Sequence, residues 1–180
     1  MAEIPDPTAR LDAEGRELLA ELAGPRGRVG GMYRTMLLNP ALTRAVSGLG
    51  AYLRFGSTAL TDRHRELVIL RVARATGAAY EWVSHEPVAR RLGVGDEVLE
   101  AMRRGEPPAG LEPVERDLLA AAGLVVERRS LPADLQGRLV EAIGEPGVLE
   151  LTMLTGFYAA IAGFIAAFDV PLPEGAEPPF

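Results

Sequence analysis

The chain has 180 residues and no cysteine, and it carries 25 acidic against 19 basic residues, which gives a formal net charge of −6. This length is enough to bury a core without metals or disulfides. The missing thiols exclude disulfides, thiolate nucleophiles and cysteine-ligated metal centres. An acidic chain without a run of Lys and Arg is not expected to bind nucleic acid. The N-terminus has no basic start and no apolar core, so we expect no secretory signal and a cytoplasmic protein.

Apolar residues recur at helical spacing along the chain, and no window alternates with the period of two that is typical of a strand. The pattern predicts an all-α, multi-helix bundle in a single domain covering residues 1–180. Mobile tails are expected at residues 1–10 and 169–180, which are rich in Pro and acidic groups. Helices are predicted over residues 11–23, 29–38, 40–55, 61–75, 78–92, 95–104, 113–127, 132–143 and 146–168.

The last of these helices is the most apolar part of the chain. Residues 148–168 approach the length that a bilayer requires, with Glu150 as their charged residue. No Lys or Arg flanks them, which favours a fully buried helix over a membrane span. Small residues at three- or four-residue spacing would let another helix approach, either within the subunit or from a second copy: Gly156, Ala159, Ala160 and Gly163.

Residues 61–93 predict a helical hairpin whose first helix carries a carboxylate on its apolar face. Thr61 is a suitable N-cap, and Gly77 stands where the chain must reverse. On a helical wheel, Glu66 falls in the same sector as Ile69. Glu66 is therefore expected to point into the core.

The second helix adds two polar groups that are also expected to face inward. Glu81 and His85 are four residues apart and so lie one turn above the other on the apolar stripe. They lie at about the same level of the hairpin as Glu66, and carboxylates around a buried imidazole raise its pKa. We therefore interpret Glu66, Glu81 and His85 as a candidate catalytic acid–base cluster, with Tyr80 and Trp82 beside it as candidate substrate-binding residues.

The remaining polar residues of the hairpin are expected to be solvated. Glu86 and Arg90 lie on the outward side of the second helix, and His64 lies in a charged first turn. Pro87 is expected to kink the second helix just after His85, because it removes one backbone hydrogen bond. Such a kink would open a cavity beside the cluster.

The stretch RELVILRVARATGAAYEWVSHEPVARRLGV, preceded by PALTRAVSGLGAYLRFGSTAL, resembles the carboxymuconolactone decarboxylase and alkyl hydroperoxidase D superfamily. In the peroxidase branch, a glutamate, two cysteines and a histidine occupy the positions of Glu66, Ala78, Glu81 and His85. Neither Ala78 nor Glu81 can form a disulfide, so a thiol peroxidase is not expected. The resemblance implies an all-helical fold, homo-oligomers that are commonly trimers or hexamers, and cofactor-free proton-transfer or decarboxylation chemistry with His85 as the leading acid–base group.

The residues leave several functions open. The first is a lyase or isomerase acting on a small molecule, in which case an anionic substrate would need a cation; Arg63 and Arg71 both lean outward on the helical wheel. The second is a non-catalytic scaffold or binding protein in which the cluster holds helices together. A third is a mononuclear metal site on Glu66, Glu81 and His85, although no spacing is diagnostic of one, and we expect no metal.

Overall fold

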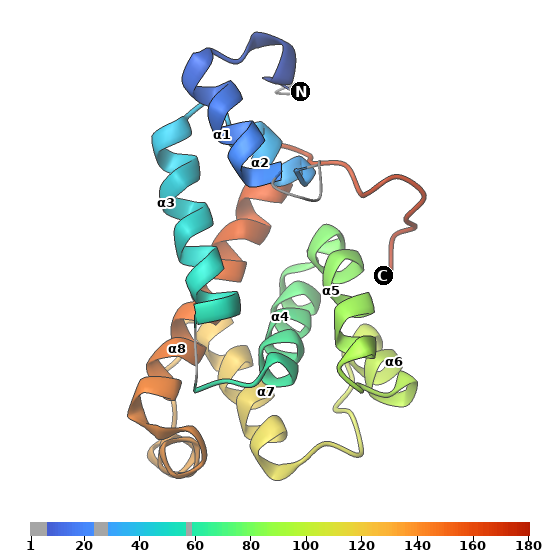
Figure 1. Ribbon diagram of the computed structural model, residues 1–180. Coiled ribbons are helices and arrows are strands. Elements are labelled where there is room, and N and C mark those ends of the chain that lie inside the picture. Colours follow the sequence, from blue (N-terminus) through green and yellow to red (C-terminus); the bar gives the residue numbers. More distant parts are fainter. Residues whose placement is uncertain (1–6, 24–28, 57–58) are drawn as a thin grey trace.

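A computed structural model describes residues 7–23, 29–56 and 59–180, and in these ranges it contains helices and no strand (Figure 1). The all-α prediction is therefore confirmed. The elements follow in the order η1 (Pro7–Arg10), α1 (Ala13–Ala23), α2 (Gly31–Met36), α3 (Pro40–Ala51), η3 (Tyr52–Gly56), α4 (Asp62–Thr76), α5 (Ala79–Arg91), α6 (Asp96–Arg104), α7 (Pro113–Val126) and α8 (Ala133–Ala167).

Two differences from the predicted helices have a local cause. The helix expected over residues 40–55 is α-helical as far as Ala51 and then continues as the π-helical turn η3. The two helices expected at the C-terminal end are joined into α8 across a kink at Gly144, where φ is 72° and ψ is 165°. A left-handed φ of this kind suits glycine, because glycine has no Cβ to clash with the backbone.

Helix α4 is the central element of the bundle. It packs against α5, α7 and α8, and its residues Leu67, Val68, Ile69 and Leu70 have no exposed surface. Four consecutive buried residues leave no solvent-facing side at this level of the helix. Glu66 directly precedes them and follows Arg65, which is also buried. It therefore lies in the interior together with its neighbours in the sequence.

The α4–α5 hairpin forms as the sequence predicts. The Thr61 side chain accepts a hydrogen bond from the backbone N–H of His64, at 3.1 Å, and so caps α4. Gly77 ends α4 with a φ of 68° and reverses the chain into α5. Helix α5 then runs through Pro87 to Arg91 without a break in its helical assignment.

Helix α8 has one buried and one exposed face. Its buried residues, among them Leu151, Leu154 and Ile161, pack into the core, whereas Leu149 is 69% exposed and Met153 is 53% exposed. The expectation of a fully buried helix is therefore wrong for the outer face. Among the described residues, α8 is the one helix long and apolar enough to cross a membrane by length and composition, with 44% of its most apolar window buried inside the molecule.

The described terminal segments pack against the helices. Residues 1–6 of the expected N-terminal tail lie outside the described residues, and Pro7 in η1 is buried. At the other end, Val170 is buried, and the segment after α8 runs across to α5 (Figure 1). There the Phe180 ring meets Trp82 edge-on, with 5.7 Å between the ring centres. The C-terminal segment is thus part of the packed structure rather than a projecting tail.

Candidate active site

The three predicted site residues meet in the interior between α4 and α5. The Nδ1 atom of His85 lies 2.7 Å from the Oε2 atom of Glu66, and its Nε2 atom lies 3.4 Å from the Oε2 atom of Glu81. Each of the three residues is no more than 6% exposed. The hairpin therefore places the imidazole between two carboxylates, one at each ring nitrogen.

Tyr158 from α8 completes this cluster. Its hydroxyl oxygen lies 3.4 Å from His85 Nε2, and the two rings meet edge-to-face with 5.3 Å between their centres. Burial raises the pKa of the Tyr158 hydroxyl, and the Arg54 charge opposes this while Glu81 and Glu66 add to it. The phenol therefore stays protonated over the whole neutral range and can donate a hydrogen bond.

The two carboxylates decide the protonation of His85. Burial lowers the pKa of the imidazole, but the hydrogen bonds and charges of Glu66 and Glu81 outweigh burial, and the pKa is raised above its usual value. The two carboxylates therefore favour the imidazolium form of His85. His85 can then donate from Nδ1 to Glu66 and still offer a proton at Nε2.

The Nε2 side of the cluster opens into a cavity of about 810 Å³. Glu81, His85 and Tyr158 line it, whereas Glu66 does not. Glu66 therefore lies behind the imidazole and orients it, while Glu81 shares the cavity wall with His85. The cavity is formed where α1, α2, α3 and η3 lean over α5 and α8.

Of the described residues, two arginines line the cavity: Arg44, which is paired with Glu21 at 2.6 Å, and Arg54, a candidate cation that the sequence did not locate. Arg54 lies in the π-helical turn η3, lines the cavity together with Tyr33 and Tyr80, and is half-buried. Its charge acts on both Tyr33 and Tyr158, because it lowers the pKa of each hydroxyl against the larger effect of burial. A π-helical turn is a common carrier of functional residues. The weak candidates Arg63 and Arg71 do not line this cavity, and Arg63 is bound to Glu115 at 2.6 Å.

The two aromatic candidates have different places in the structure. Tyr80 lines the cavity, and its hydroxyl accepts a hydrogen bond from the backbone N–H of Gly31, at 3.1 Å. Trp82 does not line the cavity; it is fully buried on another side of α5 and its indole N–H donates to Glu86 at 2.7 Å. The ring has no path to a substrate beside His85, so its role there is packing.

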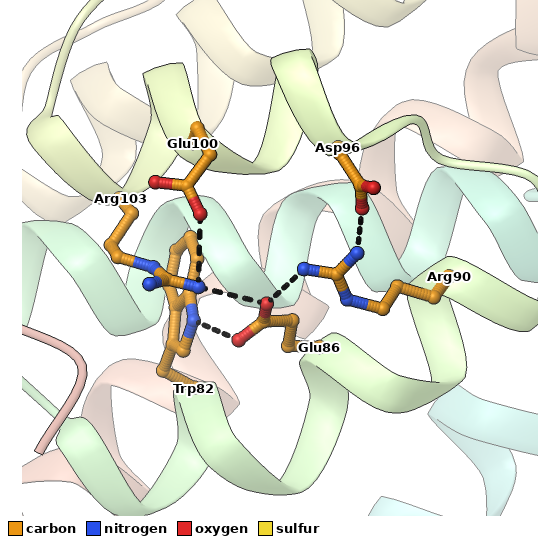
Figure 2. A network of polar contacts seen from close by, with 6 residues as sticks. All are labelled: Trp82, Glu86, Arg90, Asp96, Glu100 and Arg103. Carbon is orange, nitrogen blue, oxygen red and sulfur yellow. Dashed lines mark hydrogen bonds and ion pairs between the residues drawn. The ribbon is translucent and has the colours of Figure 1, made fainter. Parts of the chain in front are cut away.

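Glu86 is the centre of a polar network that the sequence did not reveal (Figure 2). It accepts from Trp82, from Arg90 at 2.8 Å and from Arg103 of α6 at 3.0 Å. Burial raises the pKa of the Glu86 carboxyl, but these hydrogen bonds and the arginine charges outweigh burial and lower it. Glu86 therefore ties α5 to α6, and the expectation of a simply solvated residue is wrong.

His64 also departs from its expected exposure. It is half-buried, and its Nδ1 atom has no hydrogen-bond partner in the part of the chain that the structure describes. Burial lowers its pKa, the Glu115 charge raises it, and the charges of Arg63 and Arg65 lower it again, so that it falls below the usual value. The two histidines of the chain thus shift in opposite directions.

The geometry of the cluster bears on the metal alternative. Glu66 and Glu81 lie at opposite nitrogens of the His85 ring, so one ion could not contact both carboxylates and the imidazole together. Within the described residues, no group of three or more His, Asp or Glu side chains has an arrangement that could hold a metal ion.

Two functional residues were missed for the same reason. Arg54 stands in an aromatic stretch that predicts only an amphipathic helix, and Tyr158 stands in an apolar helix that predicts only packing. One signal was available for each residue. Arg54 is a charge at the end of a predicted apolar helix, and Tyr158 is an aromatic residue with a hydroxyl group on the buried side of a helix. Neither signal specifies which cavity the side chain enters, because that depends on how distant helices pack.

Comparisons with known proteins agree with this fold. Residues 40–124 match the carboxymuconolactone decarboxylase family. Among solved structures, an alkylhydroperoxidase AhpD core protein from Ralstonia eutropha JMP134 is 19% identical with a TM-score of 0.81, covering 96% of this chain and 92% of its own. A peroxidase-related protein from Silicibacter sp. TM1040 is 18% identical with a TM-score of 0.80 and the same coverage.

Two further proteins show the range of the similarity. The debrominase Bmp8, solved with 2,3,4-tribromopyrrole, is 18% identical with a TM-score of 0.73 and covers 90% of this chain and 87% of its own. Kelch-like protein 34 from Homo sapiens is 33% identical over 128 residues, so the chain spans 15% of that protein's length. At these identities the solved structures support the fold alone. The segment that matches the carboxymuconolactone decarboxylase family contains Glu66, Glu81 and His85, and the chain around it has an AhpD-like fold and no cysteine.

Proposed function

We propose that this protein is a cofactor-free acid–base enzyme, a lyase or isomerase that acts on a small carboxylate or lactone. The observation that carries the proposal is the position of His85, which is held between two carboxylates with Nε2 facing a cavity of about 810 Å³. The bound tribromopyrrole of the debrominase Bmp8 supports a small ring compound as ligand for this fold.

The cluster can move protons without a cofactor. Glu81 takes a proton from an acidic carbon of the substrate, and the imidazolium of His85 gives its Nε2 proton to the atom where negative charge develops. The proton then returns from Glu81 to His85, which is 3.4 Å away. In a decarboxylation, the C–C bond to the carboxylate breaks, CO₂ leaves, and the electron pair stays on the carbon. His85 then protonates that carbon, and solvent restores the proton of His85.

Arg54 and Tyr158, which also line the cavity, stabilise negative charge on the substrate. Arg54 binds the substrate carboxylate, since a guanidinium and a carboxylate form strong charge-assisted hydrogen bonds. The neutral Tyr158 hydroxyl, 3.4 Å from Nε2, donates to an oxygen on which charge accumulates in the transition state. Glu66 is a positioning residue, because it acts on substrate only through the imidazole.

The test is proton exchange in D₂O, followed by NMR on a panel of small β-keto acids and unsaturated lactone carboxylates. His85→Gln and Glu81→Gln are expected to lower the exchange rate by about a hundredfold or more, the usual contribution of a positioned acid or base. His64→Gln is the matched control, because His64 does not line the cavity, and it is expected to keep the wild-type rate. Equal rates in all four proteins would overturn the proposal.

A non-catalytic scaffold is the second candidate, favoured by the near-complete burial of the cluster. A scaffold requires that His85→Gln lowers the free energy of unfolding strongly and that no small carboxylate perturbs the cavity. An enzyme instead requires that the variant stays folded while exchange is lost. A thermal melt run beside the exchange assay therefore separates the two functions.

We also propose that the protein acts in the cytoplasm as a homo-oligomer, a trimer or hexamer. The exposed face of α8 carries Leu149, Met153 and the small residues Gly156, Ala160 and Gly163. The π-helical turn η3 lies beside this face, since Tyr52 of η3 donates a hydrogen bond to Glu150 of α8 at 2.9 Å. It adds Phe55, which is 71% exposed. A continuous apolar surface of this kind is typical of a subunit interface.

A further inference from the structure

A second cavity of about 350 Å³ lies apart from the candidate active site and shares no lining residue with it. It is enclosed by α4, by the connector between α6 and α7, and by α7 itself. Three arginines line it, Arg71 and Arg74 from α4 and Arg116 from α7. In a chain with a formal net charge of −6, this concentration of positive charge is local and specific.

The guanidinium groups are held in place by the backbone around them. Arg74 donates from Nε to the carbonyl oxygen of Arg103 at 2.7 Å, and its Cζ lies 5.1 Å from the centre of the Phe180 ring. Arg116 donates to the carbonyl oxygen of Leu111. Neither contact neutralises a charge, since both acceptors are uncharged carbonyl groups.

Arg71 is the most informative of the three. A Cβ atom added at Gly123 of α7 would lie 2.7 Å from Arg71 Nη2, so the guanidinium occupies the space that a side chain there would fill. No hydrogen bond or ion pair joins Arg71 to any residue that the structure describes. A half-buried guanidinium that is positioned but unpartnered favours an anion from outside the chain.

The remaining lining residues indicate what kind of group the rest of a ligand would need. The cavity contains a single carboxylate, that of Glu106, which is already bound by Arg104 at 2.7 and 2.9 Å. The floor is apolar and buried, with side chains from α6, α7 and the connector between them: Met102, Leu111 and Leu119. A ligand that fits must pair an anionic group with an apolar body.

We propose that this cavity is a binding site for a small organic anion, namely a carboxylate carried on an aryl or short alkyl group. The carboxylate is bound by Arg71 and Arg74, with Arg116 at the rim, and the apolar part lies on the Met102 side. The site is separate from the proposed catalysis and stands whether or not His85 is catalytic.

Methyl NMR of the methionines tests this directly. The chain has five methionines, of which Met102 lines this cavity and Met32 lines the other. With ¹³C-methyl-labelled protein, benzoate is expected to shift the Met102 signal saturably, and the neutral analogue benzamide is not. Arg71→Gln and Arg74→Gln are each expected to weaken benzoate binding by about tenfold, the effect of losing a charge-assisted hydrogen bond.

Matched controls identify the site. Arg129→Gln removes the same charge from an arginine that is 66% exposed and outside both cavities, and Arg54→Gln removes one of the two arginines that line the other cavity; both are expected to leave the Met102 response unchanged. Arg71→Lys, which keeps the charge, is expected to retain part of the affinity. A Met102 signal that does not move, that moves equally with benzamide, or that responds unchanged in both glutamine variants would overturn the proposal.

Discussion

His85 combines two opposing effects in one side chain. Burial alone would favour the neutral imidazole, yet the carboxylates at its two nitrogens, 2.7 and 3.4 Å away, outweigh burial. The same contacts that hold the ring in place therefore also favour its charged form. A proton held in this way, at the wall of a cavity, is available for transfer near neutral pH.

The raised pKa of His85 predicts how stability depends on pH. A group whose pKa is higher in the folded state stabilises that state fully below its unfolded pKa, about 6.5 for histidine, and this contribution is lost as the pH rises through the folded pKa. Urea unfolding from pH 6 to 9 should show a stability difference between wild type and His85→Gln that is largest at low pH. Both proteins should also carry His64→Gln, since the lowered pKa of His64 makes stability depend on pH in the opposite direction. A difference that does not vary with pH would contradict this prediction.

Arg54 predicts a change in substrate affinity. If it binds the substrate carboxylate, Arg54→Gln should raise KM for a carboxylate substrate by about tenfold or more, because about 1.5–3 kcal/mol of charge-assisted hydrogen bonding is lost. The corresponding amide or ester should be bound equally by both proteins. Steady-state kinetics on the acid and its methyl ester check this, and an equal loss on both substrates would show that Arg54 acts on the fold instead.

At the scale of the elements, α5 has two different polar sides. One side carries Glu81 and His85 to the cavity, and the other carries Glu86 to α6 (Figure 2). Trp82 lies between them and joins the second side through its indole N–H. Helix α5 is therefore held on one side by Glu66 of α4 and on the other by Arg103 of α6. These two contacts limit how far α5, and the site on it, can move.

The Glu86 network predicts a measurable contribution to stability. Glu86→Ala should lower the free energy of unfolding by about 1–3 kcal/mol, because it leaves the buried Trp82 N–H without an acceptor. Glu100→Ala is the matched control: its carboxylate is 46% exposed and contacts Arg103 at 3.3 Å, and exposed pairs contribute less than about 1 kcal/mol. Chemical denaturation compares the two, and a similar loss in both variants would argue against the role assigned to Glu86.

Periodicity predicted what depends on local sequence. The α4–α5 hairpin, with its cap at Thr61 and its reversal at Gly77, follows from residues that are neighbours in the chain, and so does the meeting of Glu66 with His85. The Glu86 network, Arg54 and Tyr158 could not be predicted in this way. Arg54 and Tyr158 reach the site from distant elements, and the Glu86 network joins bonds within α5 to Arg103 of α6. A helical wheel shows which side of a helix is apolar but not which helix covers it.

At the scale of the whole molecule, the helices leave two cavities and an exposed apolar surface to which we assign functions. The larger cavity lies beside His85, the smaller one beside Arg71. The apolar surface on α8 and η3 adds large exposed side chains, including Leu149, Met153 and Phe55. Because patches of this kind mark interaction sites in soluble proteins, a second copy of the chain is the proposed occupant.

A charge placed on this surface should dissociate the proposed oligomer. Met153→Glu puts a carboxylate at the centre of the exposed α8 face and should shift the mass in solution toward the monomer, because burying an unpaired charge costs several kcal/mol. Arg129→Glu, at an exposed position in the connector before α8, is expected to leave the mass unchanged. Light scattering coupled to gel filtration measures both, and a Met153→Glu protein with the wild-type mass would contradict the interface.

The most direct test of the proposed chemistry is an NMR titration of the His85 ring in wild type and in Glu81→Gln, with His64→Gln used to assign the two histidine signals. The proposal predicts a wild-type pKa above the usual histidine value of about 6.5, and a lower pKa once Glu81 is neutralised. It also predicts a signal that responds to added carboxylate substrate. A ring that never titrates, or one whose pKa does not change in Glu81→Gln, would show that the cluster is structural and that the acid–base function should be abandoned.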